Sequence, residues 1–129
     1  MPTTMPTTTH KETATDFLKL AASGRAREAF DRYVSRDFRH HNAFFPGDGP
    51  SLMKAMDENA AQNPDKELTI HRVVAEGDEV ATYSEVHHKK GDRGAAVVHI
   101  FRFEGDRIVE LWDVGQEVPA DSPNKNGMF

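Results

Sequence analysis

The chain of 129 residues contains no cysteine. This absence excludes a disulfide framework, a thiol nucleophile and a thiolate-bound metal, and it makes a cytoplasmic location the expectation. No stretch approaches the roughly eighteen consecutive apolar residues of a membrane-spanning helix, so we expect no membrane partner. Residues 1–8 lack both a basic start and an apolar core. They are therefore expected to form a polar, flexible tail rather than a signal peptide.

Long basic runs and glycine-rich phosphate loops are also missing. The formal net charge is −5, so no nucleic-acid partner is expected. The "EGD" and "GDRG" stretches are typical of turns, and none follows a strand and opens a helix, so no nucleotide cofactor or other cofactor is indicated. Glu85, His87 and His99 would form a two-histidine, one-carboxylate set if a hairpin placed them on one face. Because the sequence has neither His-x-His nor HExxH spacing, no metal site is predicted.

What the sequence does contain is the composition of an ordinary globular protein, with 37% hydrophobic and 29% charged residues. Its length suits one domain with one core and a modest cavity, which we place at residues 9–129. In "KETATDFLKLAASG", the spacing of Ala14, Phe17, Leu18 and Ala21 predicts a helix. Similar stripes predict helices in "RAREAFDRYVS" and "PSLMKAMDENAAQ", with a short extended piece and a loop between those two.

The second half of the chain changes to the period of strands. Four strand-like runs are separated by "EGDE", "KKGDRG" and "EGDR", which are typical hairpin turns and predict an antiparallel meander. Three helices followed by four strands predict an α+β fold in which the helices cover one face of a curved sheet. A curled sheet closed by helices on one side leaves an internal pocket.

Asp113 interrupts an apolar run in the last strand, directly after the only tryptophan. A three-residue loop at 104–106 would pair His99 with Leu111 and place Asp113 diagonally on the same face as His99. A two-residue loop would pair Phe103 with Ile108 and exchange the faces. The residues alone leave both registers open.

Three stretches carry a resemblance to a known family: "FRHHNAFFPGDG", "GDRGAAVVHIFRFEGDRIVELWDVGQ" and the terminal "NKNGMF". In these stretches the chain resembles the NTF2-like superfamily, and specifically its SnoaL-like polyketide cyclase or predicted ester cyclase branch. It implies a cone of three N-terminal helices packed on a curved, mostly antiparallel sheet. It further implies a largely apolar pocket, and a homodimer formed through the sheet.

The resemblance favours the register that places His99 and Asp113 together. It implies that Asp113 is the pocket acid or base, and that His99 occupies the position of a carboxylic acid in similar steroid isomerases. Asn42 matches the base of those isomerases, but an amide cannot abstract a proton, so Asn42 is expected to bind a carbonyl. His41 is then the candidate for proton transfer from that side. Further ligand-binding residues are expected to be Tyr83, Glu85, Phe17, Phe101 and Leu111.

Two classes of function follow from this interpretation. The first is a cofactor-independent enzyme for aldol-type cyclisation or isomerisation of a small hydrophobic carbonyl compound, with catalytic Asp113, His99 and His41. The second is a non-catalytic small-molecule-binding module. A purely structural role also stays open, with Asp113 hydrogen-bonded by the C-terminal tail, Arg102 or Arg107, and His99 as a core histidine.

Overall fold

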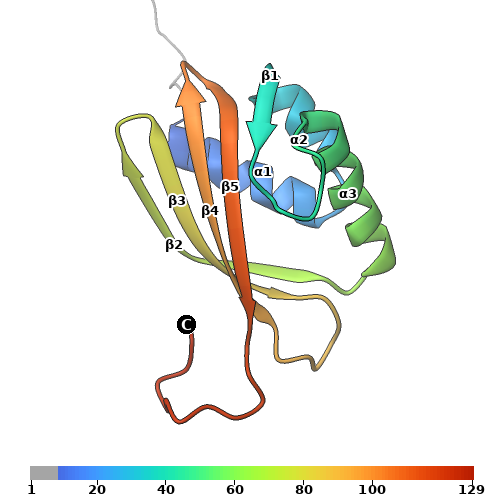
Figure 1. The fold of residues 1–129 in the computed structure, drawn as a ribbon, viewed down its shortest axis with the longest axis vertical. Coiled ribbons are helices and arrows are strands. Elements are labelled where there is room, and N and C mark those ends of the chain that lie inside the picture. Colours follow the sequence, from blue (N-terminus) through green and yellow to red (C-terminus); the bar gives the residue numbers. More distant parts are fainter. Residues whose placement is uncertain (1–8) are drawn as a thin grey trace, which may run out of the picture.

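Three helices precede a meander of strands in the computed structural model, which describes residues 9–129 (Figure 1). The predicted tail, residues 1–8, lies outside the described residues. The elements are α1 (His10–Ala22), α2 (Ala26–Tyr33), β1 (Val34–His40), α3 (Gly49–Gln62), β2 (Glu67–Glu76), β3 (Glu79–His87), β4 (Ala95–Glu104) and β5 (Arg107–Glu117).

The three predicted helices are present, and local capping explains where two of them begin. Thr9 and Glu12 form a capping box, in which the Glu12 backbone N–H donates to Thr9 Oγ1 over 3.1 Å. Asp48 caps α3 by accepting a hydrogen bond from the Ser51 backbone N–H over 2.9 Å. These contacts satisfy backbone donors that a helix leaves unpaired in its first turn.

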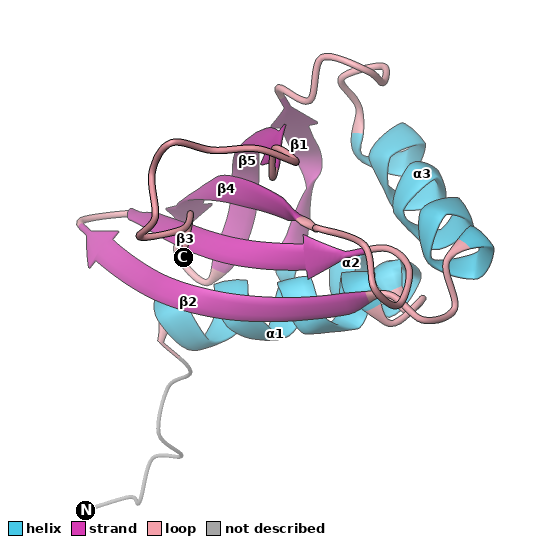
Figure 2. Ribbon diagram, turned by 90° about the horizontal axis from the view of Figure 1, so that it is seen from below, coloured by secondary structure: helices cyan, strands magenta, loops and turns pink. Residues whose placement is uncertain are grey.

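The strands form one sheet in the order β1-β5-β4-β3-β2. The predicted meander β2 to β5 is antiparallel, and the extended piece expected before α3 becomes β1, which pairs parallel to β5. The sheet is strongly curved, so β5 and β2 run in very different directions, and the helices lie on one side of it (Figure 2). The α+β cone is therefore confirmed. We call the helix-covered side of the sheet the inner face and the opposite side the outer face.

The core joins the helices to the inner face through aromatic packing. Phe17 of α1 lies between Phe30 of α2 and Phe101 of β4, with ring centroids 5.4 and 5.7 Å away. Phe17 and Phe101 are completely buried. Burial of such large apolar rings stabilises the helix layer on the sheet.

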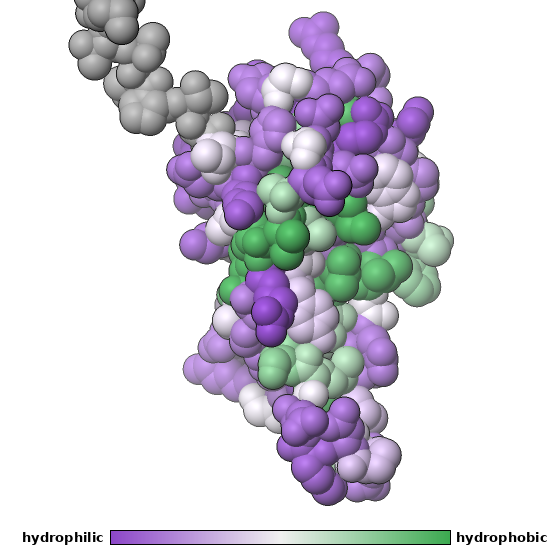
Figure 3. All heavy atoms as spheres, turned by 90° about the vertical axis from the view of Figure 1, so that its left-hand side faces the viewer, coloured by the Kyte–Doolittle hydropathy of each residue, from purple (hydrophilic) through white to green (hydrophobic). Residues whose placement is uncertain are grey.

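On the face drawn in Figure 3, most of the hydrophobic residues lie in the middle of the molecule, and hydrophilic residues cover its two ends. Of the helices in residues 9–129, none combines the length and the apolar character that crossing a membrane requires.

The hairpin between β4 and β5 combines features of both predicted registers. Gly105, with a φ of 59°, and Asp106 form a two-residue turn, so Phe103 pairs with Ile108. A β-bulge follows directly, where the pairing shifts between Arg102 and Phe103. The extra residue restores the original faces, because one inserted residue reverses the side-chain alternation. The predicted three-residue loop is therefore wrong, but the shared face that it implied is present.

Candidate functional site

A row of polar side chains crosses the inner face of the sheet. His99 of β4 pairs directly with Asp113 of β5 on one side and with Thr82 of β3 on the other. Ser84 lies one step further along β3 on the same face. His99, Thr82 and Ser84 are 8%, 1% and 0% exposed. This burial is unusual for polar groups and needs compensating hydrogen bonds.

Those hydrogen bonds are missing for three atoms. Within residues 9–129, the Thr82 hydroxyl, the Ser84 hydroxyl and Nδ1 of His99 have no hydrogen-bond partner. Leaving such a group buried and unpaired costs about 1–3 kcal/mol. These three atoms lie on neighbouring positions of the inner face.

His99 and Asp113 approach one another without forming a hydrogen bond. Nε2 of His99 and Oδ2 of Asp113 are 4.0 Å apart, which exceeds hydrogen-bonding distance. The pKa of His99 is lowered to about 4, chiefly by burial; the charge of Asp113 opposes this effect, and the charge of Lys66 adds to it. The imidazole is therefore neutral at pH 7 and able both to donate and to accept a proton.

Asn42 orients the carboxylate. Its Nδ2 donates to Oδ2 of Asp113 over 3.1 Å, and its own Oδ1 accepts from the Phe44 backbone N–H. The structure thus brings Asn42, His99 and Asp113 together, whereas the binding of a carbonyl by Asn42 stays a prediction. The partner of Asp113 is Asn42 rather than the C-terminal tail or an arginine, because Arg102 bonds Glu110 and Arg107 bonds backbone carbonyls of α2.

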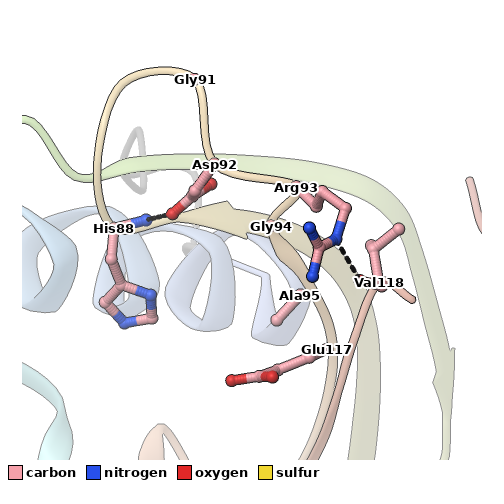
Figure 4. Close-up of a pocket in the computed structure, with 8 residues that line it drawn as sticks. All are labelled: His88, Gly91, Asp92, Arg93, Gly94, Ala95, Glu117 and Val118. Atoms are coloured by element: carbon pink, nitrogen blue, oxygen red, sulfur yellow. Dashed lines mark hydrogen bonds between the residues drawn. The ribbon is translucent and has the colours of Figure 1, made fainter. Parts of the chain in front are cut away.

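A cavity of about 330 Å³ opens at the far end of this face. Figure 4 shows its lining, where Glu117 of β5 extends toward the side on which the His88 ring lies. Ala95 pairs with Glu117, two alternate positions beyond the pair of His99 and Asp113. Burial lowers the pKa of His88, and Lys66 lowers it further, while Asp92 and Glu117 oppose this. The row of polar groups therefore leads toward a charged rim.

His41 lies elsewhere, and its predicted approach to Asp113 from the pocket is wrong. Its ring stacks on Trp112 with centroids 4.8 Å apart, and its Nε2 is 2.6 Å from Oε2 of Glu110. Both partners lie on the outer face, because they alternate with Leu111 and Asp113. His40 is the buried one of the two histidines, with its Nε2 2.6 Å from the Pro46 carbonyl oxygen.

Sequence reasoning overlooked Glu110. This carboxylate is only 5% exposed, and it receives hydrogen bonds from Arg39 and Arg102 in addition to its contact with His41. These contacts, with Arg39 the strongest, lower the pKa of Glu110 to about 2. The signal was present in the strand alternation, since Glu110 shares a face with Trp112 in an otherwise apolar run.

Tyr83 and Glu85 are also on the outer face, so the structure does not bring them to His99. The Tyr83 hydroxyl donates to the Met128 carbonyl, and Glu85 lies within 2.9 and 2.6 Å of His71 and His87. The register explains this, because Thr82 rather than Tyr83 pairs with His99. Glu85 and His87 accordingly do not converge with His99. Across residues 9–129, no set of three or more His, Asp or Glu side chains is placed to hold a metal ion.

Phe17, Phe101 and Leu111 are at most 1% exposed. Their side chains are enclosed by protein atoms and form the packed end of the cone. They belong to the buried core, and their role as ligand contacts stays a prediction. Among the apolar side chains of the inner face, those of Leu68, Ile70 and Val97 are half-buried and keep part of their surface exposed.

Thr82 and Ser84 were not among the predicted site residues. Their signal was the alternation Val80, Thr82, Ser84, Val86, which places two hydroxyls on a buried face. Finding them from the sequence would have required the pairing of β3 with β4.

Comparison with known proteins was made for both sequence and fold. The sequence matches the SnoaL-like domain family over residues 14–111. No protein of curated function matches it. The fold is similar to that of wild-type IdmH from Streptomyces antibioticus, a candidate polyketide cyclase, at 21% identity and a TM-score of 0.67 over 81% of this chain and 90% of that one.

Two further solved structures share the fold. A candidate polyketide cyclase from Bacillus cereus ATCC 10987 has 18% identity and a TM-score of 0.70, covering 81% of this chain and 72% of that one. A candidate ketosteroid isomerase from Kribbella flavida DSM 17836 has 18% identity and a TM-score of 0.67, with coverages of 89% and 83%. At such identities these structures establish the fold alone, whereas the family match spans most of the sequence. The chain therefore belongs to the SnoaL-like domain family.

Proposed function

We propose that the protein binds a small hydrophobic carbonyl compound on the inner face and catalyses proton transfer next to the carbonyl without a cofactor. The observation that carries this proposal is the set of three buried polar atoms without partners, on Thr82, Ser84 and His99. If the side chains that enclose these atoms move apart to admit the ligand, its carbonyl or enolate oxygen would accept hydrogen bonds from them, and Asp113 lies beside them. Relatives in fold named as candidate cyclases and an isomerase support this reaction class.

The chemistry follows from the two ionisable groups. Asp113 would remove a proton from the carbon next to the carbonyl as a general base. Neutral His99, with Nδ1 unengaged, would donate a hydrogen bond to the carbonyl oxygen on which negative charge develops. The resulting enolate would attack a second carbonyl in an aldol-type cyclisation, and Asp113 would return its proton to the alkoxide formed. In an isomerisation Asp113 would return the proton to another carbon.

Valerophenone, an apolar aromatic ketone, is a suitable probe for binding. We expect NMR titration to shift the signals of Thr82, Ser84 and His99. A Val97→Trp substitution would fill the inner face beside His99 and weaken binding by about tenfold or more. The matched Val74→Trp variant, on the outer face at a position that is 61% exposed, should bind as the wild type does. Equal affinity in both variants would contradict the proposal.

A non-catalytic binding module is the second candidate. The observation in its favour is the 4.0 Å separation of His99 and Asp113, which leaves the two groups without a direct hydrogen bond. Ligand binding on the inner face without any proton exchange at the ligand would select this function.

We further propose that two copies associate through the outer face. Val98, Ile100, Trp112 and Val114 line a hollow of about 290 Å³ there. An apolar patch on a sheet favours burial against a second copy. Sedimentation should show a dimer for the wild type and a monomer for Val114→Glu. Phe44→Glu, at a position that is 89% exposed in a loop, should stay dimeric. A monomeric wild type would refute this association.

A further inference from the structure

Lys66 is a charged residue of the inner side that the reaction proposed above does not use. It precedes β2 and alternates with the inner residues Leu68 and Ile70. Its Nζ donates to Oδ1 of Asn59 on α3 over 2.7 Å, so the ammonium lies between the helix and the sheet. The side chain is half-buried.

This ammonium has no charged partner. Among the ion pairs that residues 9–129 form, none includes Lys66. Burial lowers its pKa, which is the sign of a cation held away from water. A half-buried cation next to a neutral amide is stabilised when an anion approaches it.

The ammonium belongs to the rim end of the inner side. Because Glu67 pairs with His87, Lys66 lies level with His88, which lines the rim cavity. Its charge lowers the pKa of both His88 and His99. The unpartnered hydroxyls of Thr82 and Ser84 are on β3, between β2 and β4. Asp113 is on β5, and two strands separate it from β2, which corresponds to about 14 Å of sheet width.

We propose that Lys66 binds the carboxylate of the ligand, so that the substrate is an apolar keto acid rather than a neutral ketone. This inference rests on the proposed function and adds the substrate class. The carboxylate would lie at Lys66 and Asn59, while the carbonyl reaches His99 and the two hydroxyls. The separation of Lys66 from Asp113 keeps the carboxylate of the ligand away from the general base, whereas Asp92 and Glu117 line the rim cavity.

Two nearly isosteric probes test the proposal, 4-benzoylbutyrate and its neutral amide, 4-benzoylbutyramide. We expect the wild type to bind the carboxylate about tenfold more tightly than the amide, which is the size of one charge-assisted hydrogen bond. In Lys66→Met and Lys66→Gln this preference should vanish while the amide binds unchanged. Lys66→Arg should keep part of the preference, and the exposed Lys19→Met should keep all of it.

Isothermal titration at constant pH measures the affinity of each protein for both probes, and thermal unfolding confirms that each variant is folded. Equal binding of both probes by the wild type, or a preference retained in both neutral variants, would overturn the role of Lys66 alone. Failure of both probes to bind, or binding that Val97→Trp leaves intact, would overturn the proposed function as well.

Discussion

Replacing Asp113 by asparagine is expected to slow protein-catalysed proton exchange at the carbon next to a bound ketone by about a hundredfold or more. The amide cannot accept the proton, whereas its shape preserves the contact with Asn42, which bonds the native carboxylate over 3.1 Å. The rate can be followed by NMR as deuterium uptake into valerophenone, a measurement that does not require the natural substrate. Binding of valerophenone should persist, because Asp113 acts on the proton rather than on the oxygen.

Asp121→Asn is the matched control, since Asp121 is exposed in the segment after β5. Its exchange rate should equal that of the wild type. Exchange that is unaffected by Asp113→Asn would assign the proton transfer to another group. No exchange above the uncatalysed rate in the wild type, with valerophenone bound, would leave the binding module as the function.

Replacing Glu110 by glutamine should lower the free energy of unfolding at pH 7 by about 1–3 kcal/mol, the typical loss when hydrogen bonds to a charged group are weakened. The buried carboxylate binds Arg39 and Arg102 and contacts His41, and the variant leaves these groups without their anion. Because Arg39 is largely exposed, water screens part of the loss.

The free energy of unfolding of the wild type and of Glu110→Gln should also depend differently on pH. The folded pKa of Glu110 is about 2, against an ordinary value of 4.5 in the unfolded chain. Its contribution is therefore complete above about pH 5 and disappears as the pH falls from 4.5 to 2. Chemical unfolding at several pH values should show the two proteins converging near pH 2. Glu58→Gln, on the exposed side of α3, should change stability by less than about 0.5 kcal/mol. A gap between wild type and Glu110→Gln that is unchanged at pH 2 would contradict this account.

The helices and strands could be predicted from the sequence, because the spacing of apolar residues that indicates them is a property of short segments. The stripe containing Phe17 and the turns at "EGDE" and "EGDR" each need only neighbouring residues to be understood. The shared face of His99 and Asp113 was also predicted, but the structure reaches it through a two-residue turn followed by a β-bulge rather than through a three-residue loop. The bulge after the Gly105 turn depends on how β5 packs, and a single hairpin sequence does not specify it.

Several residues that the resemblance assigned to the pocket lie on the outer face instead. Tyr83 and Glu85 were expected beside His99, but β3 pairs so that Thr82 and Ser84 occupy that face. His41 was expected in the pocket, whereas the parallel pairing of β1 with β5 directs it to Trp112 and Glu110. Side chains on neighbouring positions of a strand point to opposite faces, so a shift of one residue exchanges the whole set.

The order of elements, the α+β class and an ionisable pair in an apolar strand were encoded in short stretches of the chain. Which polar groups are buried without partners, and which cation lies between α3 and the sheet, depended on contacts between segments far apart in the sequence. In the sequence Lys66 is an ordinary loop lysine. In the structure its contact with Asn59 of α3 leaves it half-buried. Pairing and burial are properties of the assembled chain, and these properties give the inner face its chemistry.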